Sequence, residues 1–516
     1  MRKSYFTFLL FVSIILISCK SSNSVDILTN DSFVTMSEAD YRPVFHFTPL
    51  LHWMNDPNGL VYYKGKYHLF YQYNPNGSTW GPMNWGHAVS TDLFNWQDLR
   101  VALTPDNLGT IFSGSAVVDS LNTTGFKYGD EDPLVAIFTH AGSQQKQSLA
   151  YSYDGGYTWV KYSMNPVLSN PGIPDFRDPK VMWFELQKEW VMTLATGNKV
   201  SFYSSPDLKN WTFESYFGEG IGAHGGVWEC PDLFQLPVEG TNQKKWVLLA
   251  SINPGAPNGG SGTQYFVGNF DGHTFSTETT TTRWIDYGTD NYAGVTYNNI
   301  PTSDGRRLFI GWMSNWNYAG VVPTTTWRST MTVPRVISLV ERNGSYELRF
   351  NPVSELANYL SDTKSTTLSN ISNVQLDDND VIKSGSYEAS FTADLTNTDT
   401  LTLSMGNKAE DLTISFNKKD GLVTVDRSKS GYIDFNDQFK KNIISPLNLS
   451  STTHVLNVQV VVDKTSLEFF WNNGENVMTV LYFPKYQYNK LSIQGNSAET
   501  IIKDFSLKGI KKSLLR

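Results

Sequence analysis

Three short segments, far apart in the chain, each combine a carboxylate with a nearby proline and with an aromatic or cationic side chain. They are WMNDPNG at 53–59, FRDP at 176–179 and WECP at 228–231. Hydrolysis of a glycosidic bond needs this equipment: a carboxylate that attacks, a carboxylic acid that protonates the leaving oxygen, and side chains that hold the sugar. Taken together, the three segments predict a glycosidase.

Each segment alone has an ordinary structural explanation. Asp-Pro-Asn-Gly is a common turn sequence, because proline presets φ and Asn-Gly accepts positive φ. Arg177 and Asp178 would serve equally well as an ion pair at a turn, and Glu229 as a residue at a strand end. The combination, in this order and with these neighbours, is far more specific than any one member.

The combination resembles glycoside hydrolase family 32, the invertases, inulinases and levanases that cleave β-fructofuranosides, from about Phe45 to the C-terminus. The resemblance implies that Asp56 is the nucleophile, Glu229 the acid/base, and Asp178 a stabiliser of the transition state. It implies no metal or cofactor, and the sequence shows no metal-ligand spacing and no phosphate-binding glycine loop. A retaining enzyme of this kind holds its two reacting carboxyl groups about 5 to 5.5 Å apart.

Further positions match the sugar-binding residues of the family. They are Trp53, Asn55, Gln72, Trp80, Phe112, Ser113, Arg177, Trp312 and Trp316. Tryptophan faces suit the C–H faces of sugars, but a tryptophan in a sheet more often belongs to the core, which we expect for Trp85, Trp96, Trp159 and Trp211. Asp286 and Asp290 are competing carboxylates that we expect to brace a sheet, while Tyr292 is placed to approach the site.

The reaction sets requirements on the surroundings of these groups. Asp56 must stay ionised, and Asn55 is a plausible hydrogen-bond donor to it. Glu229 must carry a proton near neutral pH, which apolar neighbours such as Trp228 would favour. Cys230 either tunes Glu229 or is an inert buried thiol.

The fold class follows from composition and repeats. Fourteen of fifteen tryptophans lie between Trp53 and Trp327, whereas the sequence after about Asn351 shows the period-two alternation of half-buried strands. In the first part, Asp92, Asp154, Asp207 and Asp271 recur 53 to 64 residues apart, each shortly before an aromatic residue. This period predicts four-stranded propeller blades, with room for five. A sandwich or a β-helix explains the period less well.

We therefore predict an all-β protein, and the family resemblance likewise implies a five-bladed β-propeller followed by a β-sandwich. The expected parts are a signal peptide (1–18), a lipid-anchored tether (19–40), the propeller (41–340), a linker (341–355) and the sandwich (356–516).

The N-terminus predicts export. Arg2 and Lys3 precede a short apolar run, and the segment 16–19 (LISC) resembles a lipoprotein processing site with Cys19 as the lipidated residue. A conventional signal peptide with a chance cysteine is the alternative. The net charge is −8 and the sequence contains no block of basic residues, so we do not expect nucleic acid as a partner. We expect a lipoprotein held to a membrane through Cys19, facing the periplasm or the cell surface, with the oligomeric state left open.

The leading functional hypothesis is an exo-acting β-fructosidase that releases fructose from fructans (levan, inulin or both) and also cleaves sucrose. The alternatives are an endo-levanase or endo-inulinase, a fructosyltransferase that passes the same covalent intermediate to a sugar, and a non-catalytic carbohydrate-binding propeller. Asp56 favours exo action, because several endo-inulinases of the family carry glutamate at the matching position.

Overall fold

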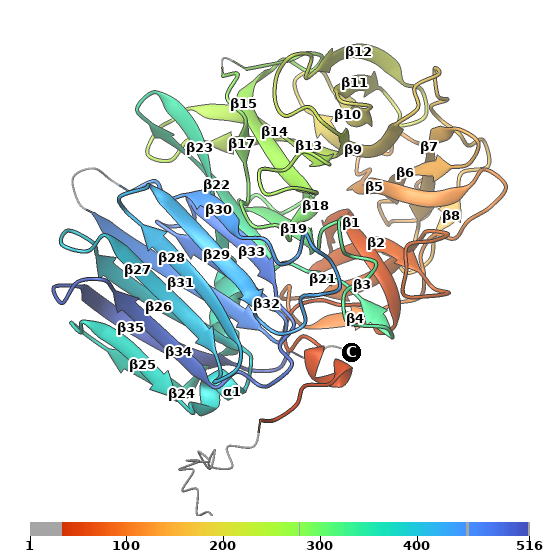
Figure 1. Cartoon of the computed structure of the whole chain (residues 1–516). Coiled ribbons are helices and arrows are strands. Elements are labelled where there is room, and N and C mark those ends of the chain that lie inside the picture. The colour runs from red at the N-terminus through yellow and green to blue at the C-terminus, as the bar shows by residue number, and fades with distance from the viewer. Residues whose placement is uncertain (1–32, 278, 450–453, 514–516) are drawn as a thin grey trace, which may run out of the picture. The chain divides into compact units, whose positions relative to one another are not determined.

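The computed structural model describes residues 33–277, 279–449 and 454–513. The expected signal peptide and most of the expected tether, including Cys19, lie outside these residues. None of the described helices has the length and apolar content needed to cross a membrane. Nearly all regular structure is strand, arranged as five sheets of four or five strands followed by two sheets of six (Figure 1).

The first three sheets follow the chain in order. The first contains β1 (His52–Tyr63), β2 (Lys66–Asn74), β3 (Asn84–Ser90) and β4 (Trp96–Asp98), and β20 (Trp327–Arg328) pairs with β1 in parallel. The second contains β5 (Thr110–Val118), β6 (Leu134–Ala141), β7 (Gln145–Ser152) and β8 (Val160–Lys161). The third contains β9 (Phe176–Phe184), β10 (Glu189–Thr196), β11 (Val200–Ser205) and β12 (Thr212–Phe217).

Two further sheets complete the propeller. The fourth contains β13 (Val227–Pro237), β14 (Lys244–Asn253), β15 (Gly262–Phe270), β16 (Phe275–Ser276) and β17 (Arg283–Trp284). The fifth contains β18 (Tyr292–Thr296), β19 (Arg307–Met313), β21 (Thr330–Met331), β22 (Arg335–Arg342) and β23 (Ser345–Pro352). The pairing of β20 with β1 joins the end of the propeller sequence to its beginning. The five-bladed propeller is confirmed.

The aspartate repeat marks the turn between the third and fourth strands of four blades. Asp92 lies between β3 and β4, and its Oδ1 accepts hydrogen bonds from the backbone N–H groups of Phe94 (3.0 Å) and Asn95 (2.8 Å). Asp207 caps its turn in the same way, through Lys209 and Asn210. Because an aspartate side chain can replace a backbone acceptor in a turn, this signal was readable from the sequence.

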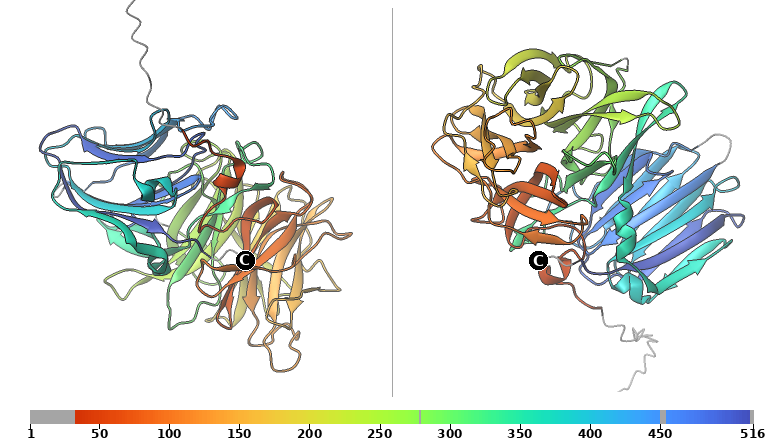
Figure 2. Two further views of the ribbon diagram at one scale, coloured as in Figure 1. Left: turned by 90° about the horizontal axis from the view of Figure 1, so that it is seen from below. Right: turned by 180° about the vertical axis from the view of Figure 1, so that it is seen from behind.

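The last third of the chain forms two stacked six-stranded sheets (Figures 1 and 2). One has the order β24 (Leu360–Leu368), β35 (Ile501–Ile510), β26 (Tyr387–Asp394), β31 (Val455–Asp463), β32 (Ser466–Trp471), β33 (Asn476–Leu481). The other has the order β25 (Asn373–Asp377), β34 (Lys490–Gly495), β27 (Thr400–Gly406), β28 (Asp411–Asn417), β29 (Leu422–Lys429), β30 (Ile443–Pro446). Alternate residues of β26 and β27 are buried between them, which confirms the β-sandwich.

Three short helices complete the described structure: η1 (Glu38–Tyr41), η2 (Ser354–Tyr359) and α1 (Asp380–Lys383). The segment 341–355, which the sequence assigned to a linker, contains β23 of the fifth blade and the start of η2. It is therefore not a free connection between the two parts.

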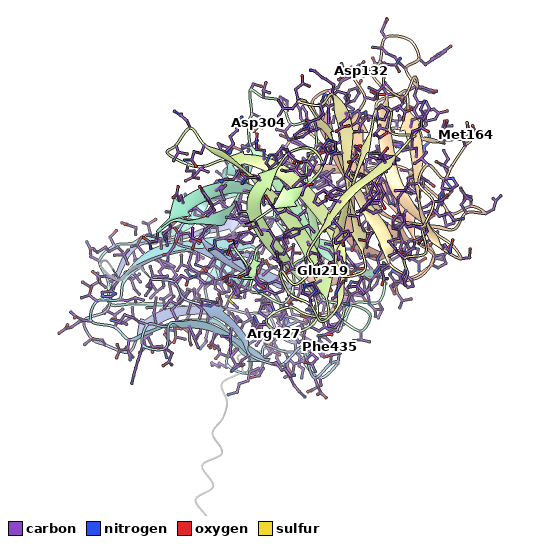
Figure 3. All side chains as sticks on the ribbon, turned by 90° about the horizontal axis from the view of Figure 1, so that it is seen from above. Asp132, Met164, Glu219, Asp304, Arg427 and Phe435 are labelled. Carbon is purple, nitrogen blue, oxygen red and sulfur yellow. The ribbon has the colours of Figure 1, made fainter. Side chains whose placement is uncertain are left out.

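Side chains fill the contact between propeller and sandwich (Figure 3). Arg335 on β22 binds Glu468 on β32, and Arg427 on β29 binds Asp290 at 2.9 Å. Asp286 accepts hydrogen bonds from the backbone and hydroxyl of Thr479 on β33. Asp286 also binds Arg335 on β22, and Asp290 accepts from the Tyr318 hydroxyl. The two carboxylates therefore brace the fifth blade, as expected, and also join it to the sandwich.

Candidate active site

The predicted catalytic carboxylates meet near the beginnings of the innermost strands of the propeller. Asp56 lies on β1, Asp178 on β9 and Glu229 on β13, and all three line one cavity of about 350 Å³. The complete lining consists of Asn55, Asp56, Gln72, Trp80, Phe112, Ser113, Gln145, Arg177, Asp178, Glu229, Asn253 and Trp316.

Each innermost strand carries an irregularity of pairing at the height of this cavity. The register shifts between Met54 and Pro57 on β1, between Ile111 and Gly114 on β5, and between Glu229 and Asp232 on β13. A β-bulge bends its strand and redirects a side chain, which places Asp56, Ser113 and Glu229 at or beside a redirected position.

Backbone strain accompanies the bulge on β13 and a similar register shift between β9 and β10. Asp178 has φ of 64° and Cys230 has φ of 46°, a region that side chains other than glycine and asparagine seldom adopt. The Cys230 backbone N–H donates to Asp178 Oδ2 at 3.0 Å, so the two strained residues hold each other. Such strain persists where the surrounding structure enforces it, and it is concentrated at functional sites.

Asp56 is half-buried and surrounded by donors. The Ser113 hydroxyl donates to Oδ2 at 2.6 Å and the Asn55 amide to Oδ1 at 3.0 Å. Burial raises the pKa of Asp56, while these two hydrogen bonds and the Cys230 thiol lower it. The thiol lies 3.6 Å from Asp56 Oδ2. The sequence left open whether Cys230 tunes Glu229 or is inert, and neither alternative includes this contact with Asp56.

Asp178 is the carboxylate most affected by its surroundings. Burial raises its pKa to about 7; the Arg177 guanidinium opposes this shift, while the negative charges of Glu229 and Asp56 add to it. Arg177 Nε lies 3.9 Å from Asp178 Oδ2. Asp178 and Glu229 thus share one guanidinium, whereas Asp56, the third carboxyl group, accepts hydrogen bonds from uncharged donors.

Glu229 has one partner on each oxygen. Arg177 donates to Oε1 from Nε (3.2 Å) and Nη2 (3.0 Å), and the Tyr292 hydroxyl donates to Oε2. Burial raises the pKa of Tyr292 far above its usual range, so this phenol stays protonated and remains a donor. Arg177 is itself oriented by Asp175 and Gln145. Glu229 is thus held at the cavity by an arginine and a tyrosine.

Comparison with known families decides the class of the protein. The family model for the glycosyl hydrolases family 32 N-terminal domain matches residues 46–352. The model for the family 32 C-terminal domain matches residues 355–509. The chain belongs to glycosyl hydrolase family 32. The two matched ranges correspond to the propeller and to the sandwich.

Relatives support the same assignment. A levanase of Bacillus subtilis is 45% identical over 92% of this chain and 71% of its own length. An extracellular exo-inulinase of Aspergillus awamori is 36% identical over 93% of this chain and 97% of its own. The crystal structure of the exo-inulinase from Aspergillus awamori superposes with a TM-score of 0.83 at 34% identity, covering 92% of this chain and 98% of that chain. The protein is a glycoside hydrolase.

The walls of the family 32 cavity are aromatic and polar. Trp80, half-exposed at 51%, packs edge-on against Phe112 with ring centroids 6.1 Å apart. Gln72 is buried, and its Nε2 has no hydrogen-bond partner among the described residues. Because an unpaired buried donor is costly, a hydroxyl of a bound sugar is a suitable acceptor for it.

Two predicted sugar-binding tryptophans do not reach the cavity. Trp53 is 1% exposed and Trp312 is fully buried, and neither lines the wall. Trp53 donates from Nε1 to Asn55 Oδ1 at 2.7 Å and stacks on Trp316, while Trp312 packs against both tryptophans. The prediction of direct sugar contact is wrong for Trp53 and Trp312, because they form the layer that supports Asn55 and Trp316.

Sequence analysis missed two residues of the wall. Gln145 begins β7 and accepts a hydrogen bond from the Phe176 backbone at 2.7 Å, whereas Asn253 ends β14. Neither stands near a recognisable motif, and only the order of the blades brings them to Asp178 and Glu229. Asn253 directly precedes the glycine-rich segment 254–262, and this proximity was the one available signal.

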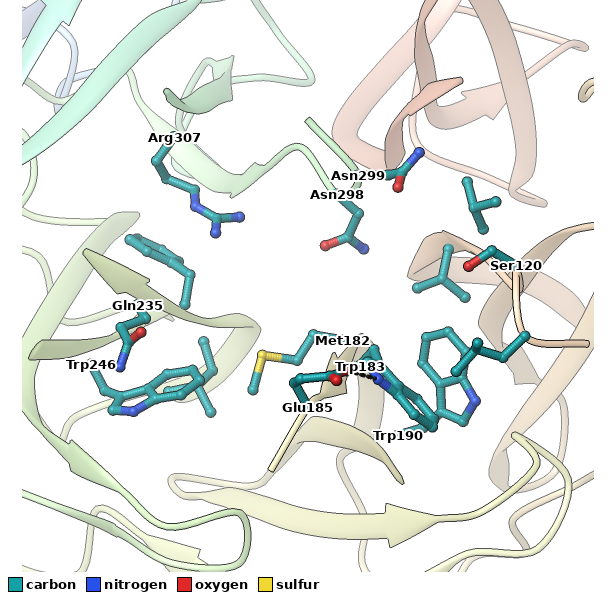
Figure 4. A pocket seen from close by; sticks show the side chains of 15 residues that line it. Ser120, Met182, Trp183, Glu185, Trp190, Gln235, Trp246, Asn298, Asn299 and Arg307 are labelled. Atoms are coloured by element: carbon teal, nitrogen blue, oxygen red, sulfur yellow. Dashed lines mark hydrogen bonds between the residues drawn. The ribbon is translucent and has the colours of Figure 1, made fainter. Parts of the chain in front are cut away.

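The same inner strands border a second cavity, of about 500 Å³ (Figure 4). It is lined by later residues of β5, β9 and β13, including Val118, Met182 and Gln235, so it lies toward the opposite end of these strands. None of the predicted site residues lines it. Among the described residues, no group of three or more His, Cys, Asp or Glu side chains is arranged to hold a metal ion.

Proposed function

We propose that this protein is a retaining, exo-acting β-fructosidase that removes terminal fructose from fructans and also cleaves sucrose. The observation that carries the proposal is the convergence of Asp56, Asp178 and Glu229 on one aromatic-walled cavity. Names of the relatives agree with the substrate class, since they include a levanase, exo-inulinases and an invertase of Saccharomyces cerevisiae.

In the proposed mechanism, Asp56 attacks the anomeric carbon of the fructosyl unit while Glu229 transfers its proton to the leaving oxygen. The bond to the leaving sugar breaks as the bond to Asp56 forms. Glu229, now ionised, takes a proton from water, whose oxygen displaces Asp56 and releases fructose with its original configuration. Ser113 and Asn55 favour the ionised form of Asp56 that the first step needs.

Asp178 and Arg177 are proposed to act on charge and position. Positive charge develops on the sugar ring in the transition state, and a buried carboxylate close to it stabilises that charge. Arg177 holds Glu229 on one side of the cavity and lies beside Asp178 on the other. Loss of an interaction made only in the transition state lowers kcat more than it changes KM.

Exo action is proposed from the size of the cavity. A volume of about 350 Å³ stands at the small end of ligand sites in proteins, which span about 300 to 1,000 Å³. Walls formed by Trp80, Phe112 and Trp316 enclose a space suited to one terminal sugar unit. An endo-acting enzyme needs a cleft that is open on both sides of the bond.

The product profile at low conversion tests the proposal. With levan, inulin and sucrose as separate substrates, we expect fructose as the dominant early product. Early release of tri- to hexasaccharides would indicate endo action, and growth of longer oligosaccharides from sucrose would indicate a fructosyltransferase. Binding of fructans without any cleavage would favour the alternative of a non-catalytic carbohydrate-binding propeller. The relative rates on levan and inulin assign the linkage preference.

We also propose that the protein is exported and anchored through a lipid on Cys19. The support is the order of charge, apolar run and LISC segment at the N-terminus. Metabolic labelling with a radioactive fatty acid should mark the wild-type protein and not Cys19→Ser, and the variant should leave the membrane fraction. Equal labelling of both would exclude Cys19 as the attachment site.

A further inference from the structure

The glycine-rich segment between β14 and β15 is fastened to the sandwich by a single side chain. Asn258 donates from Nδ2 to the backbone oxygens of Tyr287 (2.7 Å) and Ile444 (2.9 Å), and its Oδ1 accepts from the Ile444 N–H at 2.9 Å. Asn258 therefore pairs with both backbone groups of one residue on β30.

The partner on the sandwich is an exposed strand edge. β30 is the last strand of its sheet and pairs only with β29, where Ile444 stands opposite Thr424. The N–H and C=O of Ile444 point away from β29, and an edge strand needs partners for such groups. A side-chain amide has one donor and one acceptor in the geometry of a backbone peptide, so Asn258 fulfils this need.

Hydrogen bonds continue from Asn258 to the sugar cavity. Gly260 follows with φ of 67°, and a Cβ at this position would lie 2.1 Å from Asn315 Oδ1, so the turn fits closely against the fifth blade. Ser261 is buried, and its hydroxyl accepts from the Trp316 N–H at 3.0 Å and donates to Asn253 Oδ1 at 3.2 Å. Trp316 and Asn253 are both part of the cavity wall.

A second attachment supports the neighbouring segment. Asn315 donates from Nδ2 to the backbone oxygens of Gly259 and Thr289, which joins the segment around Trp316 to the glycine-rich turn. Asn436 of the sandwich donates to the Asn317 backbone oxygen at 2.8 Å. Both segments that carry the Trp316 side of the wall are thus fastened to the sandwich.

We propose that Asn258 is a positioning residue through which the sandwich sets this wall of the sugar cavity. Its amide fixes the turn at Gly260, the turn places Ser261, and Ser261 holds Trp316 and Asn253 against the bound sugar. The inference rests on the proposed fructosidase activity. It assigns the sandwich a part in substrate affinity that acts through one loop.

Comparison of Asn258→Ala with a matched control tests this proposal. Asn351→Ala removes a similar contact, because Asn351 on β23 donates from Nδ2 to the Asn473 backbone oxygen of the sandwich at 3.0 Å, far from the cavity wall. Steady-state kinetics with a defined fructo-oligosaccharide should show KM raised about three- to tenfold in Asn258→Ala, with kcat within about twofold. Asn351→Ala should keep the wild-type KM.

A double variant separates positioning from general loosening. If Asn258 acts through Ser261, Asn258→Ala and Ser261→Ala each raise KM. The KM of the double variant should then be about equal to that of the single variant with the higher KM. Full additivity, or an unchanged KM in a folded Asn258→Ala, overturns the inference. Thermal unfolding of all four variants verifies folding. A wild-type protein that releases no fructose would instead refute the proposed function.

Discussion

Two groups of buried carboxylates differ in how they are compensated. At the contact between propeller and sandwich, four buried carboxylates bind cations: Asp286 binds Arg335, Asp290 binds Arg427, Asp463 binds His46, and Glu468 binds both Arg335 and His46. The pKa of Glu468 is lowered, because Arg335 and His46 outweigh its burial. In the sugar cavity Asp178 and Glu229 share Arg177, and burial raises the pKa of both Asp56 and Asp178.

Burial alone therefore does not decide the state of a carboxylate. The interface carboxylates are as deeply buried as those of the cavity, but each faces a cation or several N–H donors. A fully paired group stabilises the fold when its partner is present and is costly when the partner is removed. An incompletely paired group costs stability and leaves a carboxylate available to a substrate, which is the usual compromise at an active site.

The largest effects are expected from the cavity carboxylates that make and break bonds. Asp56→Asn and Glu229→Gln should each lower kcat by about 10³- to 10⁵-fold, because each removes one half of the double displacement. Both variants keep the size and shape of the side chain. Fructose release and thermal unfolding are measured together, and a folded variant with full activity would exclude that residue from the chemistry.

The largest loss of stability is expected at the interface. Arg335→Met leaves Asp286 buried without its cation and leaves Glu468 with His46 alone, so the free energy of unfolding should fall by about 3 to 5 kcal/mol in urea titrations. Activity per folded molecule should change little, because Arg335 does not line the cavity. Arg342→Met is the control, since its exposed ion pair with Glu475 should contribute less than about 1 kcal/mol.

Both groups should lose stability as pH rises, but over different pH ranges. Asp178 has a folded-state pKa of about 7, above its unfolded value, so between about pH 4 and 7 the folded state holds the proton that the unfolded state has lost. Its ionisation therefore costs stability as pH rises, by up to about 4 kcal/mol above pH 7.

Asp178→Asn should remove this cost. Asparagine tolerates the positive φ and still accepts from the Cys230 N–H. The variant should unfold at a higher temperature than wild type at pH 8 and at a similar temperature at pH 4, while its activity is severely impaired. A variant less stable than wild type at pH 8 would show that the carboxylate is well compensated.

His46 at the interface loses its contribution over a higher pH range. Hydrogen bonds and charge from Asp463 and Glu468 raise its pKa to about 9 against the effect of burial. A base with a raised folded-state pKa contributes stability in full below about pH 6.5 and loses it as pH rises through about 9. The stability difference between wild type and His46→Gln, up to about 3 kcal/mol, should therefore be largest near pH 6 and smallest near pH 9.5.

Chemistry carried by a continuous segment was predictable from the sequence. Asp56, Asp178 and Glu229 stand in segments whose prolines and aromatic neighbours are distinctive, and the aspartate repeat gave the blades. What failed depends on contacts between distant residues. Trp53 and Trp312 have the composition of sugar platforms, but only the packing of the first blade against the fifth shows that Trp316 covers them.

The partners of the remaining residues are equally remote in sequence. Asp286 binds Arg335 and Asp290 binds Arg427. No residue near either aspartate in the sequence indicates these partners. Tyr292 reaches Glu229 because the fifth blade adjoins the fourth, a contact that the repeat suggests only once the number and order of blades are known.

The smallest effect is expected at Cys230, which connects the strained backbone to Asp56. Burial and the neighbouring carboxylates raise the pKa of this thiol, so it stays protonated and donates to Asp56 Oδ2. That hydrogen bond is one of three that lower the pKa of Asp56 against its burial. Cys230→Ala removes it, so the pKa of Asp56 should rise.

The acidic limb of the kcat/KM profile should report this change. In Cys230→Ala it should move to higher pH by about half a unit, the equivalent of one weak hydrogen bond. In Cys230→Ser the hydroxyl is a stronger donor than the thiol, so the limb should move to lower pH or stay in place. Because both replacements share the backbone demand of φ near 46°, strain alone would affect both variants alike. A shift in the same direction in both would therefore assign Cys230 to the backbone and not to the ionisation of Asp56.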